Sequence, residues 1–210
     1  MTVRIVYLCE GSSDEGISFH IEQIAAECGI DIVLSIPDFR LLPEPFEKTV
    51  TGKLEAVQKL GGNYDLAIIH RDADRDGTDA RRGEIKKAIS QVCPEMDFVC
   101  LIPVTMTEAW LLLDEDAIRQ VAENPRGKMP LSLPRAAHVE NIADPKQKLK
   151  EVLALASDLS GRRLKDFQKR FSQNRKRLLE QLDRNGRVTD VPSWRSFREE
   201  LEEALARVSN

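Results

Sequence analysis

Four short apolar runs alternate with amphipathic segments in the first half of the chain, and this alternation restricts the possible folds more than any other feature. The runs are rich in β-branched residues and apolar on both faces, as are central strands covered by helices on both sides. They lie at 3–9, 31–36, 64–70 and 97–102. Helical spacing predicts helices between them at 14–28, 46–60 and 80–92. This order predicts βαβ crossovers, and therefore an α/β fold with a mostly parallel four-stranded sheet flanked by helices.

The C-terminal part of the chain differs from the first part in charge. Residues 1–125 contain 12 Lys and Arg against 23 Asp and Glu, whereas residues 126–210 contain 19 against 12. The stretch 124–145 carries four prolines and predicts an irregular connection, and helical patterns follow at 146–156, 163–182 and 194–208. We therefore predict a sheet domain at 1–123, and at 124–210 an irregular connection with a basic helical extension packed on that domain.

Composition excludes several classes of protein. The four cysteines form no CxxC pair and lie on apolar segments, so we expect reduced, buried thiols rather than a zinc site. No apolar run approaches the length of a membrane span, and the N-terminus enters a predicted strand without the pattern of a signal peptide. The sequence therefore predicts a cytoplasmic protein that does not enter a membrane.

An acidic cluster follows the third predicted strand. Asp72, Asp74 and Asp76 alternate with other residues, so in extended backbone at least two carboxylates point the same way. Carboxylate oxygens are the ligands that Mg²⁺ and Mn²⁺ prefer, and open α/β sheets bind ligands beyond the carboxyl ends of their strands. A turn in which aspartates cap the next helix explains the same pattern without a metal. His70 ends the strand, where a histidine is more often simply packed.

Two further acids follow other predicted strands. Glu10 comes directly after the first strand, and Glu108 lies in the first turn of a helix that Thr107 is placed to cap, close to the end of the fourth strand. Each also has a plain structural explanation. Glu10 would then only mark the point where the first strand reaches water, and the helix dipole favours an acid at the position of Glu108. Because parallel strands end at one edge of the sheet, we expect Glu10, the aspartates and Glu108 to converge.

This ordered set of motifs resembles the Toprim fold. The motifs are CEGSSDEG, HRDADRDG and IPVTMTEAWLLLD. Within that fold the sequence is similar to the stand-alone Toprim-like family called domain of unknown function 4276, which is related to nucleases of the overcoming-lysogenization-defect group. The resemblance implies that Glu10 is the Toprim glutamate, that Asp72 and Asp74 are the metal-binding pair, and that Glu108 is a further acid of the nuclease-like branch. Asp76 is a weaker candidate ligand.

The resemblance also implies an activity. It implies a nuclease that hydrolyses phosphodiester bonds in DNA or RNA with Mg²⁺ or Mn²⁺, and a role as an anti-phage effector with an ATPase partner protein. The only tyrosines, Tyr7 and Tyr64, lie in predicted strands, so attack by activated water fits better than a covalent tyrosine intermediate. The alternatives are a metal-dependent phosphoesterase acting on a nucleotide or other small phosphorylated molecule, and a non-catalytic binding module. Clustered, mutually repelling carboxylates argue against the module.

Basic residues are concentrated between residues 162 and 177, where Asp166 is the single acid among eight cations. Apolar residues at spacings of three, four and seven predict one packed stripe that leaves the cations on the remaining helix surface. That surface suits a phosphate backbone, although a solvated helix that offsets the acidic sheet domain is equally basic. The candidate nucleic-acid contacts are Arg162, Arg163, Lys169, Arg170, Arg175 and Lys176.

Overall fold

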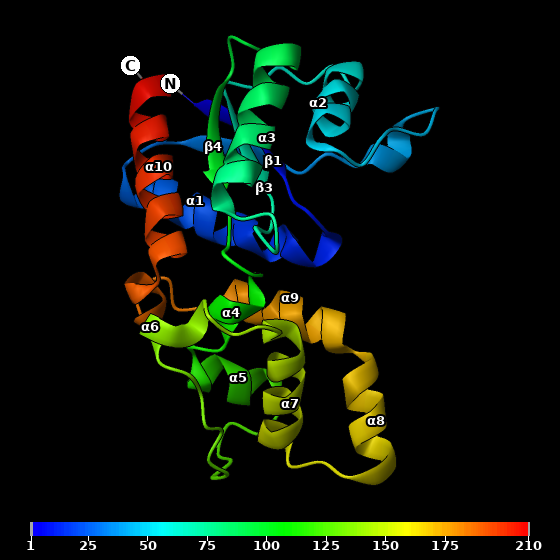
Figure 1. The fold of residues 1–210 in the computed structure, drawn as a ribbon, viewed down its shortest axis with the longest axis vertical. Coiled ribbons are helices and arrows are strands. Elements are labelled where there is room, and N and C mark those ends of the chain that lie inside the picture. Colours follow the sequence, from blue (N-terminus) through cyan, green and yellow to red (C-terminus); the bar gives the residue numbers. More distant parts are fainter. Residues whose placement is uncertain (1, 210) are drawn as a thin grey trace. The chain divides into compact units, whose positions relative to one another are not determined.

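The computed structural model of the chain describes residues 2–209 and contains a four-stranded sheet in which every strand pair is parallel. The strands are β1 (Val3–Leu8), β2 (Ile32–Ser35), β3 (Leu66–His70) and β4 (Asp97–Leu101). Their order in the sheet is β2-β1-β3-β4, so β1 and β3 form its centre (Figure 1). The predicted α/β fold with a parallel sheet flanked by helices is confirmed.

The described chain forms two compact units. Unit 1 comprises residues 2–10, 21–103 and 196–209, and unit 2 comprises residues 11–20 and 104–195. This division differs from the boundary predicted at residue 123, because residues 104–123 group with the helices that follow them and residues 196–209 return to the sheet unit. Two helices, α1 (Ile17–Glu27) and α10 (Pro192–Val208), contain residues of both units.

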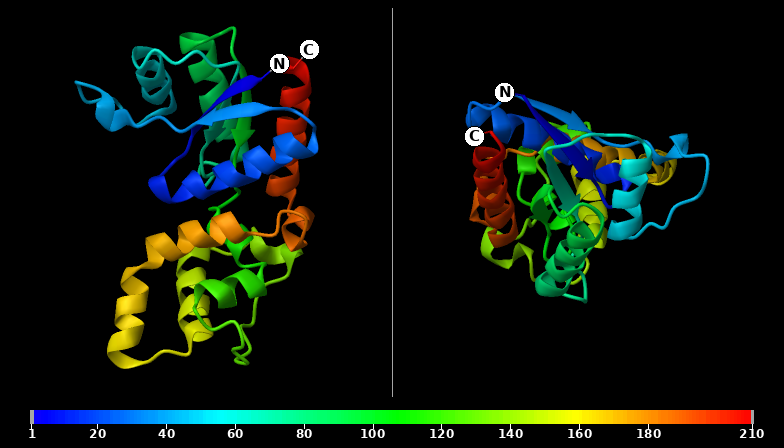
Figure 2. Two further views of the ribbon diagram at one scale, coloured as in Figure 1. Left: turned by 180° about the vertical axis from the view of Figure 1, so that it is seen from behind. Right: turned by 90° about the horizontal axis from the view of Figure 1, so that it is seen from above.

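Unit 1 is built around the sheet. Successive strand residues point to opposite faces, and one set, which includes Val6, Ala67 and Cys100, packs with α2 (Val50–Lys59) and α3 (Thr78–Val92) into a buried core. The other face of the sheet is covered by the unit 1 part of α1 (Figure 2). The remaining element of this unit is a short 3₁₀ helix, η2 (Phe39–Leu41).

The unit 1 part of α10 covers the edge strand β4. The backbone N–H of Cys100 donates to Oε1 of Glu200 over 2.9 Å, and Nη2 of Arg82 lies 2.8 Å from Oε2 of the same carboxylate. Burial and the charge of Glu200 raise the pKa of the Cys100 thiol to about 12. Because an open edge strand leaves backbone donors unpaired, Glu200 both satisfies a donor and shields this edge.

Unit 2 is helical. Its elements are η1 (Ser12–Gly16), α4 (Glu108–Leu111), α5 (Glu115–Val121), α6 (Ala136–Val139), α7 (Pro145–Ser157), α8 (Gly161–Lys169), α9 (Phe171–Gln181) and η3 (Arg187–Asp190), together with the ends of α1 and α10. The single helix predicted over 163–182 is wrong. At Arg170 the angles φ −88° and ψ 14° take the backbone out of the α region, so α8 ends and α9 begins around this residue.

No helix among residues 2–209 combines the length and the apolar content that a membrane crossing requires.

Candidate metal centre

The two central strands place two acids at the same edge of the sheet. β1 and β3 pair in a register that sets Leu8 beside Ile69. Glu10 lies two residues beyond the end of β1, and Asp72 lies two residues beyond the end of β3. Because parallel strands run in the same direction, these residues leave the sheet side by side.

Direct contacts join the ends of these strands. The backbone N–H of Asp72 donates to Oε2 of Glu10 over 2.6 Å, and Nε2 of the fully buried His70 lies 3.1 Å from Oδ1 of Asp72. Potential ligand atoms of Glu10, His70 and Asp72 all lie within 4.8 Å of one another. Since a carboxylate oxygen only accepts hydrogen bonds, Nε2 carries the proton in this contact, and His70 orients Asp72.

Two arginines surround the acids. Nη1 of Arg71 donates to Oε1 of Glu10 over 3.0 Å, and Nε of Arg81 donates to the backbone carbonyl of Asp72 over 3.1 Å. Both arginines also contact Oε2 of Glu84, at 3.4 Å from Nε of Arg71 and 3.1 Å from Nη1 of Arg81. The negative charge at the strand ends is therefore partly balanced, and two guanidinium groups lie beside it.

The loop after Asp72 turns sharply before α3. Asp74 adopts φ 46° and Gly77 adopts φ 84°, which is a left-handed region where glycine is favoured. Partial burial, followed by the negative charge of Asp72, raises the pKa of Asp74. Asp76 is exposed, and its Oδ2 lies 2.7 Å from Nη2 of Arg81. Asp74 therefore shares the electrostatic environment of Asp72, whereas Asp76 forms an ion pair.

Glu108 belongs to unit 2, where its carboxylate is paired. It is buried at the start of α4, and its Oε1 lies 2.8 Å from Nε of Arg175. Nη2 of Arg175 also donates to the buried Asp14 and to the hydroxyl of Thr107. Although burial works against the charged form, Glu108 and Asp14 raise the pKa of Arg175. The predicted convergence of Glu108 with Glu10 stays a prediction.

The predicted basic surface needs a correction at Arg175. This residue is 5% exposed and its side chain neutralises two buried carboxylates, so it is not available to a phosphate backbone. Lys176 is partly exposed, with Nζ 2.8 Å from Oε2 of Glu15. The exposed candidates are Arg162, Arg163, Lys169 and Arg170.

His70 and Arg71 flank the predicted metal-binding aspartates in the sequence and are possible phosphate contacts, but neither is among the predicted site residues, and nothing in the sequence points to Arg81. A usable signal was the spacing of His70 and Asp72, because residues two apart in extended backbone share a face. Arg81 carries no such signal, since its position beside Asp72 depends on how the loop turns into α3.

The donor set suits a hard divalent cation. Glu10 and Asp72 supply carboxylate oxygens, and each oxygen has two lone pairs, so the hydrogen bonds described above leave acceptor capacity for a metal. Oxygen donors of this kind favour Mg²⁺ or Mn²⁺ over softer metals. The residues present therefore fit the predicted cofactor.

The Toprim resemblance stays a prediction, so the functional conclusion depends on the geometry of this centre. No protein-family model matches the chain, and neither a curated protein nor a solved structure does.

Proposed function

We propose that the chain is a divalent-metal-dependent hydrolase of phosphodiester bonds in nucleic acid. The observation that supports this function is the meeting of Glu10, His70 and Asp72 within 4.8 Å at the carboxyl ends of two adjacent parallel strands. This is the edge where open α/β sheets place their ligand sites. Mg²⁺ or Mn²⁺ bound there would polarise a phosphoryl oxygen and make an attacking water more acidic.

The residues of the centre have separate roles in this proposal. Glu10 and Asp72 hold the cation, and His70 keeps Asp72 in place through the 3.1 Å contact. Arg71 and Arg81 present guanidinium groups beside the acids, and such groups bind phosphate oxygens through charge-assisted hydrogen bonds. Water is the expected nucleophile.

A polymeric substrate is favoured by the charge of unit 2. Four of the predicted contacts remain exposed on and around α8 after the correction at Arg175, and they suit a backbone of repeated phosphates better than a single phosphate group. They are Arg162, Arg163, Lys169 and Arg170.

Cleavage assays test this function. The protein is incubated with single-stranded DNA, double-stranded DNA, RNA and small phosphoesters, each with Mg²⁺, Mn²⁺ or EDTA. We expect cleavage of a polymer that depends on the metal and falls at least a hundredfold in Asp72→Asn, which keeps the side-chain shape but removes the charge. Asp79→Asn is the matched control, because Asp79 is an exposed acid in the first turn of α3.

The outcomes separate the candidate functions. Turnover of small esters alone would select a phosphoesterase that does not act on polymers. Full activity of Asp72→Asn, or cleavage in EDTA, would contradict the metal centre. Absence of cleavage together with absence of Mn²⁺ binding would favour a non-catalytic binding module.

A further inference from the structure

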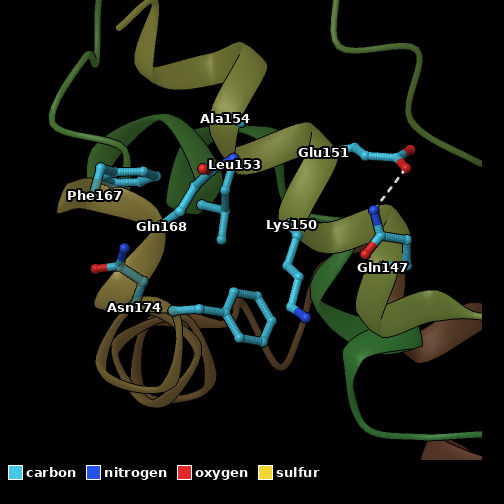
Figure 3. Close-up of a pocket in the computed structure, with 9 residues that line it drawn as sticks. Gln147, Lys150, Glu151, Leu153, Ala154, Phe167, Gln168 and Asn174 are labelled. Carbon is cyan, nitrogen blue, oxygen red and sulfur yellow. Dashed lines mark hydrogen bonds between the residues drawn. The ribbon is translucent and has the colours of Figure 1, made fainter. Parts of the chain in front are cut away.

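Unit 2 contains a pocket that the proposed metal centre does not use. It lies between α7, α8 and α9 and is an open cavity of about 490 Å³ (Figure 3). Cavities of roughly 300 to 1,000 Å³ are typical of sites for small organic groups. The residues that matter for its chemistry are Lys150, Phe167, Gln168, Phe171 and Asn174.

The floor of the pocket is apolar and aromatic. Phe167 is 3% exposed, and the partly buried Phe171 also lines the cavity. Nζ of Lys150 lies 5.2 Å from the centroid of the Phe171 ring. Figure 3 shows Lys150 and Phe167 approaching the cavity from different helices. A flat, electron-rich group with negative charge nearby suits an aromatic floor beside a cation.

One polar group that lines the pocket, the side-chain amide of Asn174, has a donor without a protein partner in the described part of the chain. Asn174 is 3% exposed, and its Nδ2 is buried without a hydrogen-bond partner among the described residues. Buried amide donors in folded proteins are almost always satisfied, so this one is open to an acceptor from outside the chain, either a water molecule or a ligand atom. Gln147, on another wall, is already engaged, because its Nε2 donates to Oε1 of Glu151 over 3.0 Å. Asn174 therefore supplies this unpaired buried donor in addition to the amide of Gln168 and the ammonium of Lys150, which also line the pocket.

The charge around the pocket indicates what carries that acceptor. Arg170, at the junction of α8 and α9, places its guanidinium carbon 5.9 Å from the centroid of the Phe167 ring, and Lys169 is exposed beside it. An aromatic floor, an unpaired amide donor and flanking cations are the features that proteins use for an unstacked base and its phosphate. An apolar side chain of a protein partner would leave the amide of Asn174 unsatisfied.

We propose that this pocket receives one unpaired nucleobase of a single-stranded nucleic acid. The base stacks against Phe171 in place of the Lys150 ammonium, which lies over that ring in the free protein. A ring nitrogen or carbonyl oxygen accepts from Nδ2 of Asn174, and the adjoining phosphate lies near the displaced Lys150 or near Arg170. The identity of the ligand rests on the proposed action on nucleic acid, but binding to the pocket requires neither the metal nor cleavage.

Fluorescence titration in EDTA tests this proposal with a single-stranded oligonucleotide that carries 2-aminopurine, a base whose emission falls on stacking. We expect quenching on binding by the wild type. Phe171→Leu removes the flat ring and should weaken binding about tenfold and abolish the quenching. Phe19→Leu is the control, since Phe19 is another partly exposed aromatic residue of unit 2 and does not line the pocket.

A second variant keeps the test valid if Phe171→Leu does not fold. Gln168 is exposed and lines the pocket, so Gln168→Glu keeps the size of the side chain, adds no aromatic ring and places a negative charge where the adjoining phosphate would lie. We expect weaker binding and the same loss of quenching. Unchanged binding and quenching in Gln168→Glu, or binding without any quenching in the wild type, would overturn the nucleobase pocket, as would absence of binding in EDTA.

These results are separable from those for the metal centre. Asp72→Asn should retain full quenching while it loses cleavage. If the wild type shows quenching without cleavage, the proposed hydrolase activity is contradicted and the nucleobase pocket is supported. If it shows cleavage without quenching, the hydrolase activity is supported and the nucleobase pocket is contradicted.

Discussion

The backbone N–H of Asp72 lies 2.6 Å from Oε2 of Glu10 and donates a hydrogen bond to it. The end of β3 thus holds the carboxylate that follows β1. Arg71 contacts the other oxygen of the same carboxylate at 3.0 Å. Both oxygens of Glu10 are fixed before any ligand arrives, and this limits the reorganisation that a bound cation would require.

Glu10→Gln should weaken metal binding without unfolding the protein. The glutamine oxygen can still accept from the N–H of Asp72, but the negative charge is lost and an amide NH₂ replaces the oxygen that faces Arg71. We expect Mn²⁺ affinity, measured by calorimetry, to fall at least tenfold, roughly the effect of losing one element of a metal site. Glu55→Gln, an exposed position on α2, should change nothing. A large drop in melting temperature with unchanged Mn²⁺ affinity would make Glu10 a structural residue.

Asp65→Asn should destabilise the protein at neutral pH and not in strong acid. Hydrogen bonds from the Arg4 side chain lower the pKa of Asp65 below its usual 3.8. The folded state therefore binds this proton more weakly than the unfolded chain. The ion pair is stabilising above the usual pKa, and its contribution is lost as pH falls through the lowered value.

Thermal melts from pH 7 down into the acid range measure this effect. The difference in melting temperature between wild type and Asp65→Asn should shrink as pH falls below 3.8 and then disappear. Asp31→Asn, at an exposed position of the same unit, should show no such pH-dependent difference. If the difference in melting temperature between the wild type and Asp65→Asn stays constant with pH, the ion pair with Arg4 is not its cause.

The sequence predicted the sheet because the relevant signals are local. Apolar β-branched runs and helical spacing place the strands to within about two residues, and parallel strands must bring their carboxyl ends to one edge. The meeting of Glu10 with Asp72 follows from that geometry. Helix ends were less accurate, since the first predicted helix begins as a 3₁₀ turn at 12–16.

Long-range contacts decide the features that the sequence pattern does not predict. The helix breaks at Arg170, but no proline or glycine in the sequence marks this position. The burial of Arg175 depends on Asp14, which is 161 residues away. One signal was nevertheless present, because Arg175 lies four residues after Phe171 and three before Leu178, on the same face as both. A lone cation on an apolar stripe requires a buried partner.

Arg175→Met should strongly destabilise unit 2. The substitution leaves the carboxylates of Asp14 and Glu108 buried without their cation, and breaking a buried ion pair in this way costs roughly 3 to 5 kcal/mol. Urea denaturation followed by tryptophan fluorescence measures the loss, because Trp110 and Trp194 both lie in unit 2 with ring centroids 5.2 Å apart.

Arg177→Met is the control for this substitution. Arg177 lies on the same helix and is exposed, so we expect a change within about 0.5 kcal/mol. Equal effects of the two substitutions would mean that the charge of Arg175 is solvated, and that it belongs to the exposed basic surface after all.

Replacing Arg163, Lys169 and Arg170 together with glutamine should weaken nucleic-acid binding and reduce its dependence on salt. These side chains are exposed, and for every phosphate that a cation no longer neutralises, the slope of log affinity against log salt concentration should fall by about 0.7 for single strands or 0.9 for duplex DNA. Binding is measured in EDTA from low to physiological salt.

A double replacement of the exposed Lys86 and Lys87 on α3 is the charge control in unit 1. Mn²⁺ affinity should remain unchanged in the triple variant, because none of its three positions belongs to the acidic group of Glu10, His70 and Asp72. An unaltered slope would show that these cations are merely solvated and would strengthen the case for a small phosphoester as substrate.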